Sequence, residues 1–157
     1  MMSRLKMGMI AGLAGTVAVA VLEVGNQLIG HWFTPFPEIL AGIMGMPDNL
    51  ALGWAVHVLM GIVVLGGAFG MLYHRLPTDT PGTRGIVFAV GTFVILLTGI
   101  MLFGNSSLLT GDNGFGTIAW LLITNVVFGL VMGIVYGQRL AREKRIEREA
   151  HDGVPAH

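Results

Sequence analysis

Long apolar runs separated by short polar segments dominate this chain of 157 residues. Four such runs lie at residues 7–30, 52–73, 85–104 and 115–137. At a rise of about 1.5 Å per residue, each run is long enough to cross the roughly 30 Å hydrocarbon core of a bilayer. The alternating pattern of a membrane β-barrel is absent from the sequence. The pattern therefore predicts an all-α, polytopic membrane protein with four transmembrane helices in a single domain over residues 1–157.

The composition supports a chain embedded in lipid. Apolar residues make up 54% of the sequence, charged residues only 11%, and 24 positions are glycine. The lipid bilayer is the first predicted partner, and the zero formal net charge gives no basis for nucleic-acid binding. Because the chain contains no cysteine, the sequence excludes disulfides, iron–sulfur clusters, thiolate zinc sites and covalent c-type haem.

The basic residues fall on one side of the predicted topology. Loops 31–51 and 105–114 contain no lysine or arginine, and all nine basic residues flank the opposite ends of the apolar runs: Arg4, Lys6, Arg75, Arg84, Arg139, Arg142, Lys144, Arg145 and Arg148. Cytoplasmic segments of membrane proteins carry such an excess of positive charge. We therefore expect a multi-pass protein of the cell inner (cytoplasmic) membrane with both termini in the cytoplasm (N-in/C-in), and a cytoplasmic helical tail at residues 138–157.

Glycines recur at helical spacing within the apolar runs. Helices in lipid associate through close packing and not through the hydrophobic effect, so small residues mark their contact faces. The pattern predicts that nine glycines pack helices together: Gly8, Gly12, Gly53, Gly61, Gly66, Gly70, Gly129, Gly133 and Gly137. These faces exceed what one bundle of four helices is expected to bury, which favours contacts with other membrane subunits or with further copies of the chain.

The second and fourth apolar runs resemble each other, which indicates an internal repeat. At a constant offset of 63 residues, four positions of the second run match identical residues of the fourth: Gly53, Gly66, Gly70 and Tyr73 match Gly116, Gly129, Gly133 and Tyr136. The predicted unit is a helical hairpin that occurs twice in tandem. Because both hairpins start in the cytoplasm, they would be parallel repeats related by a pseudo-two-fold axis along the membrane normal.

The first outer loop has the least regular sequence. Pro35 and Pro37 interrupt the chain, and residues 37–46 could form a short helix that ends before Pro47. Aromatic residues beside these prolines suit the boundary between lipid and water. We expect an interfacial half-helix that covers the outer mouth of the bundle. A connector that is only anchored in lipid is the alternative.

Isolated polar residues within the runs form the candidate site. Counted at about 1.5 Å per residue, four of them lie in the outer half of the bilayer: Glu23, His57, Thr98 and Asn125. An ionisable group facing lipid there would cost about 2.5–3.5 kcal/mol or more, so inward pairing is favoured. We expect Glu23 and His57 to approach each other. Asn125 or Gln27 would complete their hydrogen bonds.

This polar cluster can be interpreted as a contact between helices or as a functional site. As a contact, each hydrogen bond would contribute about 0.6 kcal/mol on average. As a site, a carboxylate and an imidazole in a low dielectric could exchange a proton or hold a small ligand. A membrane haem usually has two axial ligands, and His57 is the only histidine well inside a run. The sequence predicts no metal, no cofactor and no catalytic residue.

Several segments resemble a family of small four-helix bacterial and archaeal membrane proteins of unknown function, the DUF6789 type. They are ILAGIMGMPDNLALGWAVHVLMG, FGMLYHRLP, RGIVFAVGTF and VFGLVMGIVYG, and the resemblance covers nearly the whole chain up to Gly137. Its most specific part is GWxxHxxxG, formed here by Gly53, Trp54, His57 and Gly61. The resemblance implies the four-helix membrane topology and draws attention to His57, and it implies no activity.

Three functions are compatible with these patterns. The favoured one is a non-enzymatic integral membrane protein that serves as a small accessory or structural subunit of a membrane complex or homo-oligomer, because the chain has almost no extramembrane part in which to do chemistry. The second is a small transporter or proton conduit that uses Glu23 and His57. The third is an accessory subunit at a quinone or haem site of an electron-transfer complex.

Overall fold

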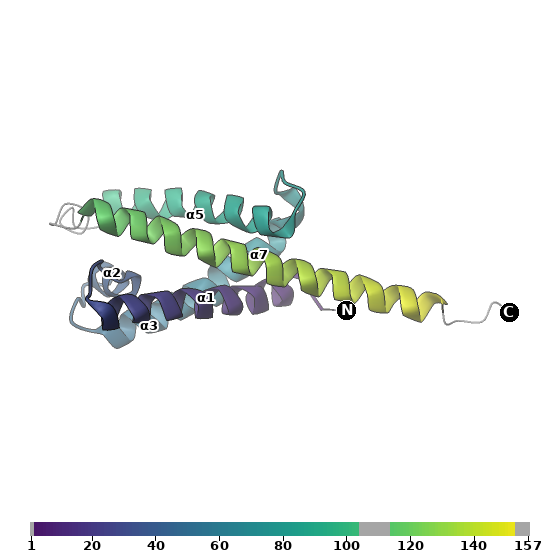
Figure 1. Cartoon of the computed structure of the whole chain (residues 1–157), viewed down its shortest axis with the longest axis horizontal. Helices are drawn as coiled ribbons and strands as arrows, with labels where there is room; N and C mark the ends of the chain where they lie inside the picture. The colour runs from purple at the N-terminus through teal and green to yellow at the C-terminus, as the bar shows by residue number, and fades with distance from the viewer. Residues whose placement is uncertain (1, 104–113, 153–157) are drawn as a thin grey trace.

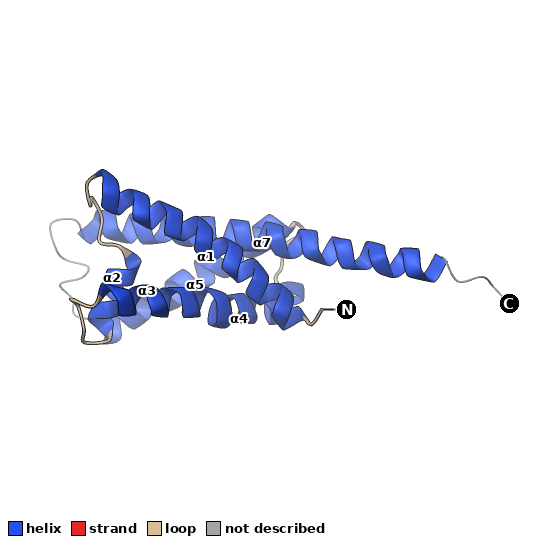
Figure 2. Cartoon of the chain, turned by 90° about the horizontal axis from the view of Figure 1, so that it is seen from below, coloured by secondary structure: helices blue, strands red, loops and turns tan. Residues whose placement is uncertain are grey.

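The computed structural model describes residues 2–103 and 114–152, and every regular element in this part of the chain is helical (Figure 1, Figure 2). The elements in chain order are α1 (Arg4–Ile29), α2 (Phe36–Ile43), α3 (Leu50–Leu59), the π-helical segment η1 (Met60–Leu65), α4 (Gly66–Leu72), the 3-10 turn η2 (Tyr73–Arg75), α5 (Pro81–Phe103) and α7 (Gly114–Asp152). Elements α3 to η2 form one continuous rod, Leu50–Arg75. Four helices are long and apolar enough to cross a membrane, which confirms the predicted all-α fold with four membrane-length helices.

The short helix expected in the first loop is present as α2, but it ends at Ile43 and not near residue 46. Proline is tolerated in its first turn, where a backbone N–H would have no helical acceptor. Gly45 then adopts a positive φ of 73°, and the N–H of Met46 donates to the carbonyl of Ala41 over 2.9 Å. This turn closes the end of the helix in the way that glycine commonly does.

The long helices form two hairpins. Helix α1 packs along η1 and α4 of the Leu50–Arg75 rod, and α5 packs along α7. Helix α7 also lies against α1 and so joins the two hairpins (Figure 1). Helix α2 packs against α3 at one end of the bundle, and the N-terminus lies toward the other end (Figure 2).

Glycine permits the close approach of helices within both hairpins. A Cβ atom added at any of the nine predicted packing glycines would come within 3.0 Å of another residue's atoms. At Gly8 it would overlap the backbone of Gly66, and at Gly133 it would overlap the carbonyl of Pro81. Close packing of this kind is the main source of helix association in lipid. The sequence analysis did not single out Gly85, which faces Gly129 in the second hairpin.

The π-helical segment η1 sets the direction of the glycine face in the rod. In a regular α-helix, Gly61 and Gly66 would point about 140° apart, because they are separated by five residues. In η1 the N–H of Gly66 donates to the carbonyl of Gly61, five residues earlier, which is the bonding pattern of a π-helix. Both glycines therefore contact Gly12 of α1. A Cβ added at Gly12 would lie 2.6 Å from the carbonyl oxygen of Gly61 and 2.9 Å from the Cα of Gly66.

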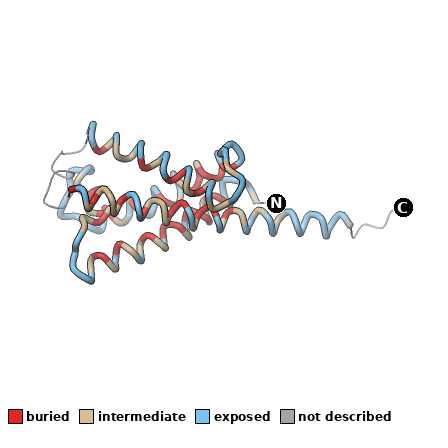
Figure 3. The backbone as a smooth tube through the Cα atoms, turned by 45° about the horizontal axis from the view of Figure 1, so that its top comes forward, coloured by how far each residue is buried: buried red, intermediate tan, exposed pale blue. Residues whose placement is uncertain are grey.

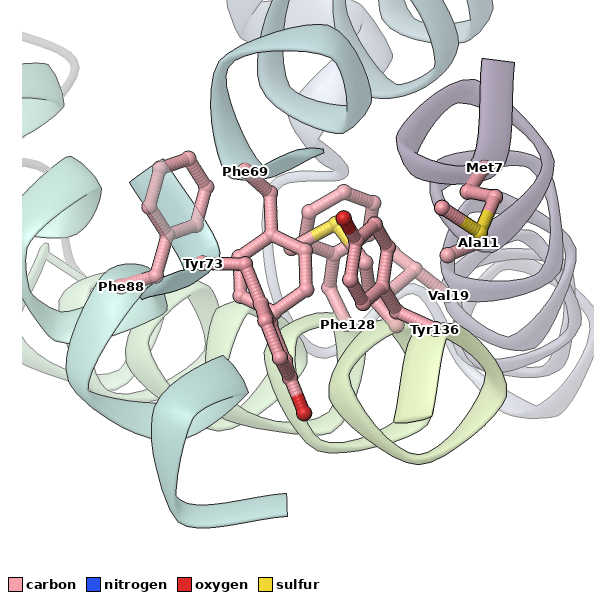
Figure 4. Close-up of a cluster of buried hydrophobic side chains, with 9 residues drawn as sticks. Met7, Ala11, Val19, Phe69, Tyr73, Phe88, Phe128 and Tyr136 are labelled. Atoms are coloured by element: carbon pink, nitrogen blue, oxygen red, sulfur yellow. The ribbon is translucent and has the colours of Figure 1, made fainter. Parts of the chain in front are cut away.

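Two clusters of buried side chains fill the bundle. The larger cluster is rich in aromatic rings (Figure 4). Its buried members are Met7, Ala11, Val19, Phe69, Tyr73, Phe88, Phe128, Met132 and Tyr136. The rings of Tyr73 and Tyr136, equivalent in the predicted repeat, have centroids 4.3 Å apart. The smaller cluster joins Ile39 of α2 to Phe93, Ile100 and Leu121. Helix α2 is thus inserted between the two hairpins.

Burial follows the inner faces of the helices and stops where α7 leaves the bundle (Figure 3). Apolar side chains on the outer faces are exposed, as lipid contact requires. The predicted tail continues α7 without a break as far as Asp152. An exposed ion pair between Arg145 and Glu149, 3.4 Å apart at i,i+4 spacing, adds at most a few tenths of a kcal/mol to this extension, roughly 0.3–0.5.

Candidate functional site

Glu23 is fully buried on α1 and bonds to two other elements. Its Oε1 accepts a hydrogen bond from the backbone N–H of Phe36, at 3.5 Å, and its Oε2 accepts one from the indole Nε1–H of Trp120, at 3.2 Å. Glu23 therefore connects α1 to the start of α2 and to α7. The sequence analysis did not identify Trp120 as a partner, although an indole N–H usually finds an acceptor when it is buried.

Asn26 reinforces this connection one helical turn later. Its Nδ2 donates to the carbonyl of Phe33 over 2.7 Å, and its Oδ1 accepts from the N–H of Phe33 over 3.2 Å. The ring of Phe33 stacks on Trp120 with a centroid distance of 5.3 Å. Together Glu23 and Asn26 fix the chain between α1 and α2. The available signal was the spacing of three residues, which sets both side chains on one face of a helix.

His57 lies on α3 and has only 7% of its surface exposed. Its ring meets the rings of Phe36 and Trp54 edge-on, each with a centroid distance of 5.6 Å. Neither ring nitrogen has a hydrogen-bond partner among the described residues. The expected pairing of Glu23 with His57 is therefore absent from the described part of the chain, because Phe36 lies between them and bonds to Glu23 through its backbone.

A cavity of about 50 Å³ lies beside His57. Its polar lining comes from Thr16 of α1, His57 of α3, and Thr124 and Asn125 of α7, and apolar side chains form the rest of the wall. The Oδ1 atom of Asn125 is buried and, like the two imidazole nitrogens, has no partner among the described residues. The structure therefore brings His57 and Asn125 to one cavity, whereas Glu23 does not line it.

The remaining two predicted polar residues do not join this group. Thr98 is exposed on the outer face of α5, and its hydroxyl donates to the carbonyl of Val94 over 2.7 Å. A threonine can satisfy its hydroxyl on its own helix in this way, so its depth in the membrane does not require it to point inward. Gln27 is half-buried on α1 and makes none of the hydrogen bonds described for Glu23.

The size and lining of the cavity limit what it can hold. A cavity of about 150 Å³ is known to accommodate a benzene ring. At about 50 Å³, the cavity beside His57 is too small for the ring of a quinone or for a haem. Within residues 2–103 and 114–152, no group of three histidine, cysteine, aspartate or glutamate side chains is placed to hold a metal ion. The wall is mostly apolar, and its few polar groups suit a small molecule that forms a few hydrogen bonds.

We expect His57→Leu to leave the stability of the protein unchanged within about 1 kcal/mol. No described residue bonds to the ring nitrogens of His57, so the replacement breaks no hydrogen bond between helices, and leucine keeps an apolar contact with Phe36 and Trp54. The measurement is the thermal unfolding midpoint of the purified protein in mild detergent. A decrease of about 3 kcal/mol would mean that His57 makes a hydrogen bond on which the fold depends.

Comparison with known proteins adds one assignment. The model of a family of unknown function, DUF6789, matches residues 2–147, which confirms the resemblance found in the sequence. No curated protein and no solved structure matches the chain. With four membrane-length helices and this match over nearly its whole length, the chain is a small multi-pass membrane protein that belongs to the DUF6789 family.

Proposed function

We propose that this protein is a non-enzymatic component of the inner membrane that acts as a small subunit of a larger membrane assembly. The observation that carries the proposal is the packing of α5. This helix packs mainly against α7, and its opposite face is exposed. The surface on that face is where a transmembrane helix of another subunit would bind.

The exposed face of α5 carries small and hydroxyl-bearing residues among bulky aliphatic ones such as Ile95 and Met101. A Cβ added at Gly91 or at Gly99 would have no described atom within 4 Å. Thr98, which precedes Gly99 in the sequence, is exposed. Small and hydroxyl-bearing residues are enriched where membrane helices meet. The nine glycines whose spacing predicted contacts with other subunits all make close contacts within one chain. Support for a partner therefore comes from α5 and not from those glycines.

The distribution of charge supports an orientation with both termini in the cytoplasm. The N-terminus, the turn between η2 and α5, and the extension of α7 lie at the end of the bundle opposite α2 (Figure 1). All nine lysines and arginines lie in or beside these segments. Membrane proteins retain such an excess of positive charge on the cytoplasmic side.

Neither alternative function gains comparable support. A proton path through Glu23 and His57 would need the two side chains to communicate, and Phe36 lies between them. An accessory role at a quinone or haem would need a larger cavity than the one beside His57. The subunit proposal is the one that uses a surface left open by the chain itself.

The test is a comparison of assemblies purified from native membranes in mild detergent. We expect the wild-type protein to elute as a homo-oligomer or with copurifying membrane subunits, and Gly91→Leu to elute mostly as a single chain. Leucine at this position fills space that a partner helix needs, while it meets no described atom of the chain itself. Size-exclusion chromatography and mass spectrometry of the eluted complex measure the outcome.

Gly25→Leu is the matched control for this test. Gly25 of α1 also has no described atom within 4 Å of an added Cβ, so its replacement makes the same chemical change on another face. We expect this variant to keep the wild-type assembly. A monomeric wild-type protein without partners, or equal behaviour of Gly91→Leu and Gly25→Leu, would refute the proposal.

A further inference from the structure

The cavity beside His57 has no part in the subunit proposal. It lies where the two hairpins face each other, with one wall from α1 and the rod and the other from α5 and α7. His57 is more than nine-tenths buried and borders the cavity, and the segment η1 begins three residues after it. Departures from α-helical geometry of this kind are frequent at functional sites.

The hydrogen-bonding groups in the cavity define what would bind there. A neutral imidazole offers one N–H donor and one nitrogen acceptor. The Oδ1 atom of Asn125 is a further acceptor. The hydroxyls of Thr16 and Thr124 already donate to carbonyls of their own helices, so their oxygens can also accept. Among the atoms without a described partner there are thus two acceptors, Asn125 Oδ1 and one imidazole nitrogen, and one donor. A ligand that pairs all three supplies two donor hydrogens and one acceptor.

The volume of the cavity sets the size of the ligand. A water molecule needs about 10–15 Å³ of such volume, so about 50 Å³ holds roughly three to five waters or a molecule of similar size. We propose that this cavity is a binding site for small neutral molecules that carry at least two donor hydrogens and one acceptor, with His57 and Asn125 as the recognising residues. Water is the smallest member of this class, and formamide is a larger one.

The proposal is tested by solid-state NMR of the protein in lipid bilayers with nitrogen-15 label in histidine. The chain has five histidines, and the His57 signals are those missing from the spectrum of His57→Gln. We expect the His57 ring N–H to show a cross-peak to water. We also expect formamide to shift the His57 ring signals in a saturable way, and N,N-dimethylformamide, which has no donor hydrogen, to shift them much less.

Two variants separate this site from general effects of the solvent. Asn125→Leu removes one acceptor at similar side-chain size, so half-maximal shift should need about two- to tenfold more formamide. Thr98→Val, on the exposed face of α5, should leave the formamide response unchanged. If Asn125→Leu fails to fold, the wild-type protein still decides. A His57 without water contact, or with equal shifts from the two amides, would overturn the proposal.

Discussion

Gly8→Leu is expected to lower the free energy of unfolding by about 3 kcal/mol, which is the upper end of the usual cost of overpacking. An added Cβ at Gly8 would overlap the carbonyl oxygen of Gly66 and lie 2.9 Å from the Cα of Gly70. These are backbone atoms, so no side chain can rotate away to make room. The two helices must separate, and α1 and α4 would lose the contact that holds the first hairpin together.

The unfolding midpoint and the monodisperse fraction of the protein in detergent measure this effect. Gly25→Leu adds the same side chain to the same helix at a position where no described atom lies within 4 Å of the Cβ, so it should stay close to wild type. If the two variants were equally stable, α1 and α4 would not approach each other as closely as the structure has them.

Glu23→Leu is expected to cost on the order of 3 kcal/mol and to loosen α2 before the rest of the bundle. The substitution leaves two partly buried donors, the N–H of Phe36 and the indole N–H of Trp120, without their acceptor. Each such group typically costs about 1–3 kcal/mol. The measurement combines the unfolding midpoint with amide hydrogen exchange, which should become faster in α2 than in α5.

Glu23→Gln is the matched control, because it keeps the size of the side chain and one acceptor oxygen. We expect it to lose about half of what Glu23→Leu loses, since one of the two donors keeps a partner. Trp120→Phe tests the same bond from the other side. It should leave the bond between Glu23 and Phe36 intact and exchange in α2 nearly unchanged. Fast exchange in all three variants would assign the effect to packing and not to these hydrogen bonds.

The sequence was sufficient for the helices and for much of their packing. The length of an apolar run decides whether it can cross a bilayer, and glycines at helical spacing favour the close approach of helices. Both features depend on neighbouring residues in the sequence and can therefore be predicted from it. The nine packing glycines were identified on that basis, and each of them has a close neighbour in the structure. The orientation in the membrane and the tandem repeat stay predictions.

The candidate site was predicted less well, because it depends on contacts between distant segments. The depth of a residue in the bilayer shows which polar residues lie at the same level. It does not show which other side chains lie between them. Phe36 separates Glu23 from His57 only because α2 folds back into the bundle. Trp120 pairs with Glu23 across 97 positions of sequence, and Thr98 turns outward because its hydroxyl is satisfied on its own helix.

The π-helical segment η1 also limits the symmetry of the molecule. Residues 63 positions apart have similar surroundings on the α4 side of η1, where Gly70 and Gly133 each meet the backbone of the neighbouring helix. On the α3 side the correspondence fails: His57 borders the cavity, while its counterpart Trp120 donates to Glu23. A change in the winding of one turn thus accompanies a chemical difference between the two hairpins in one half of the bundle, so that the predicted repeat would place the proposed site in only one of them.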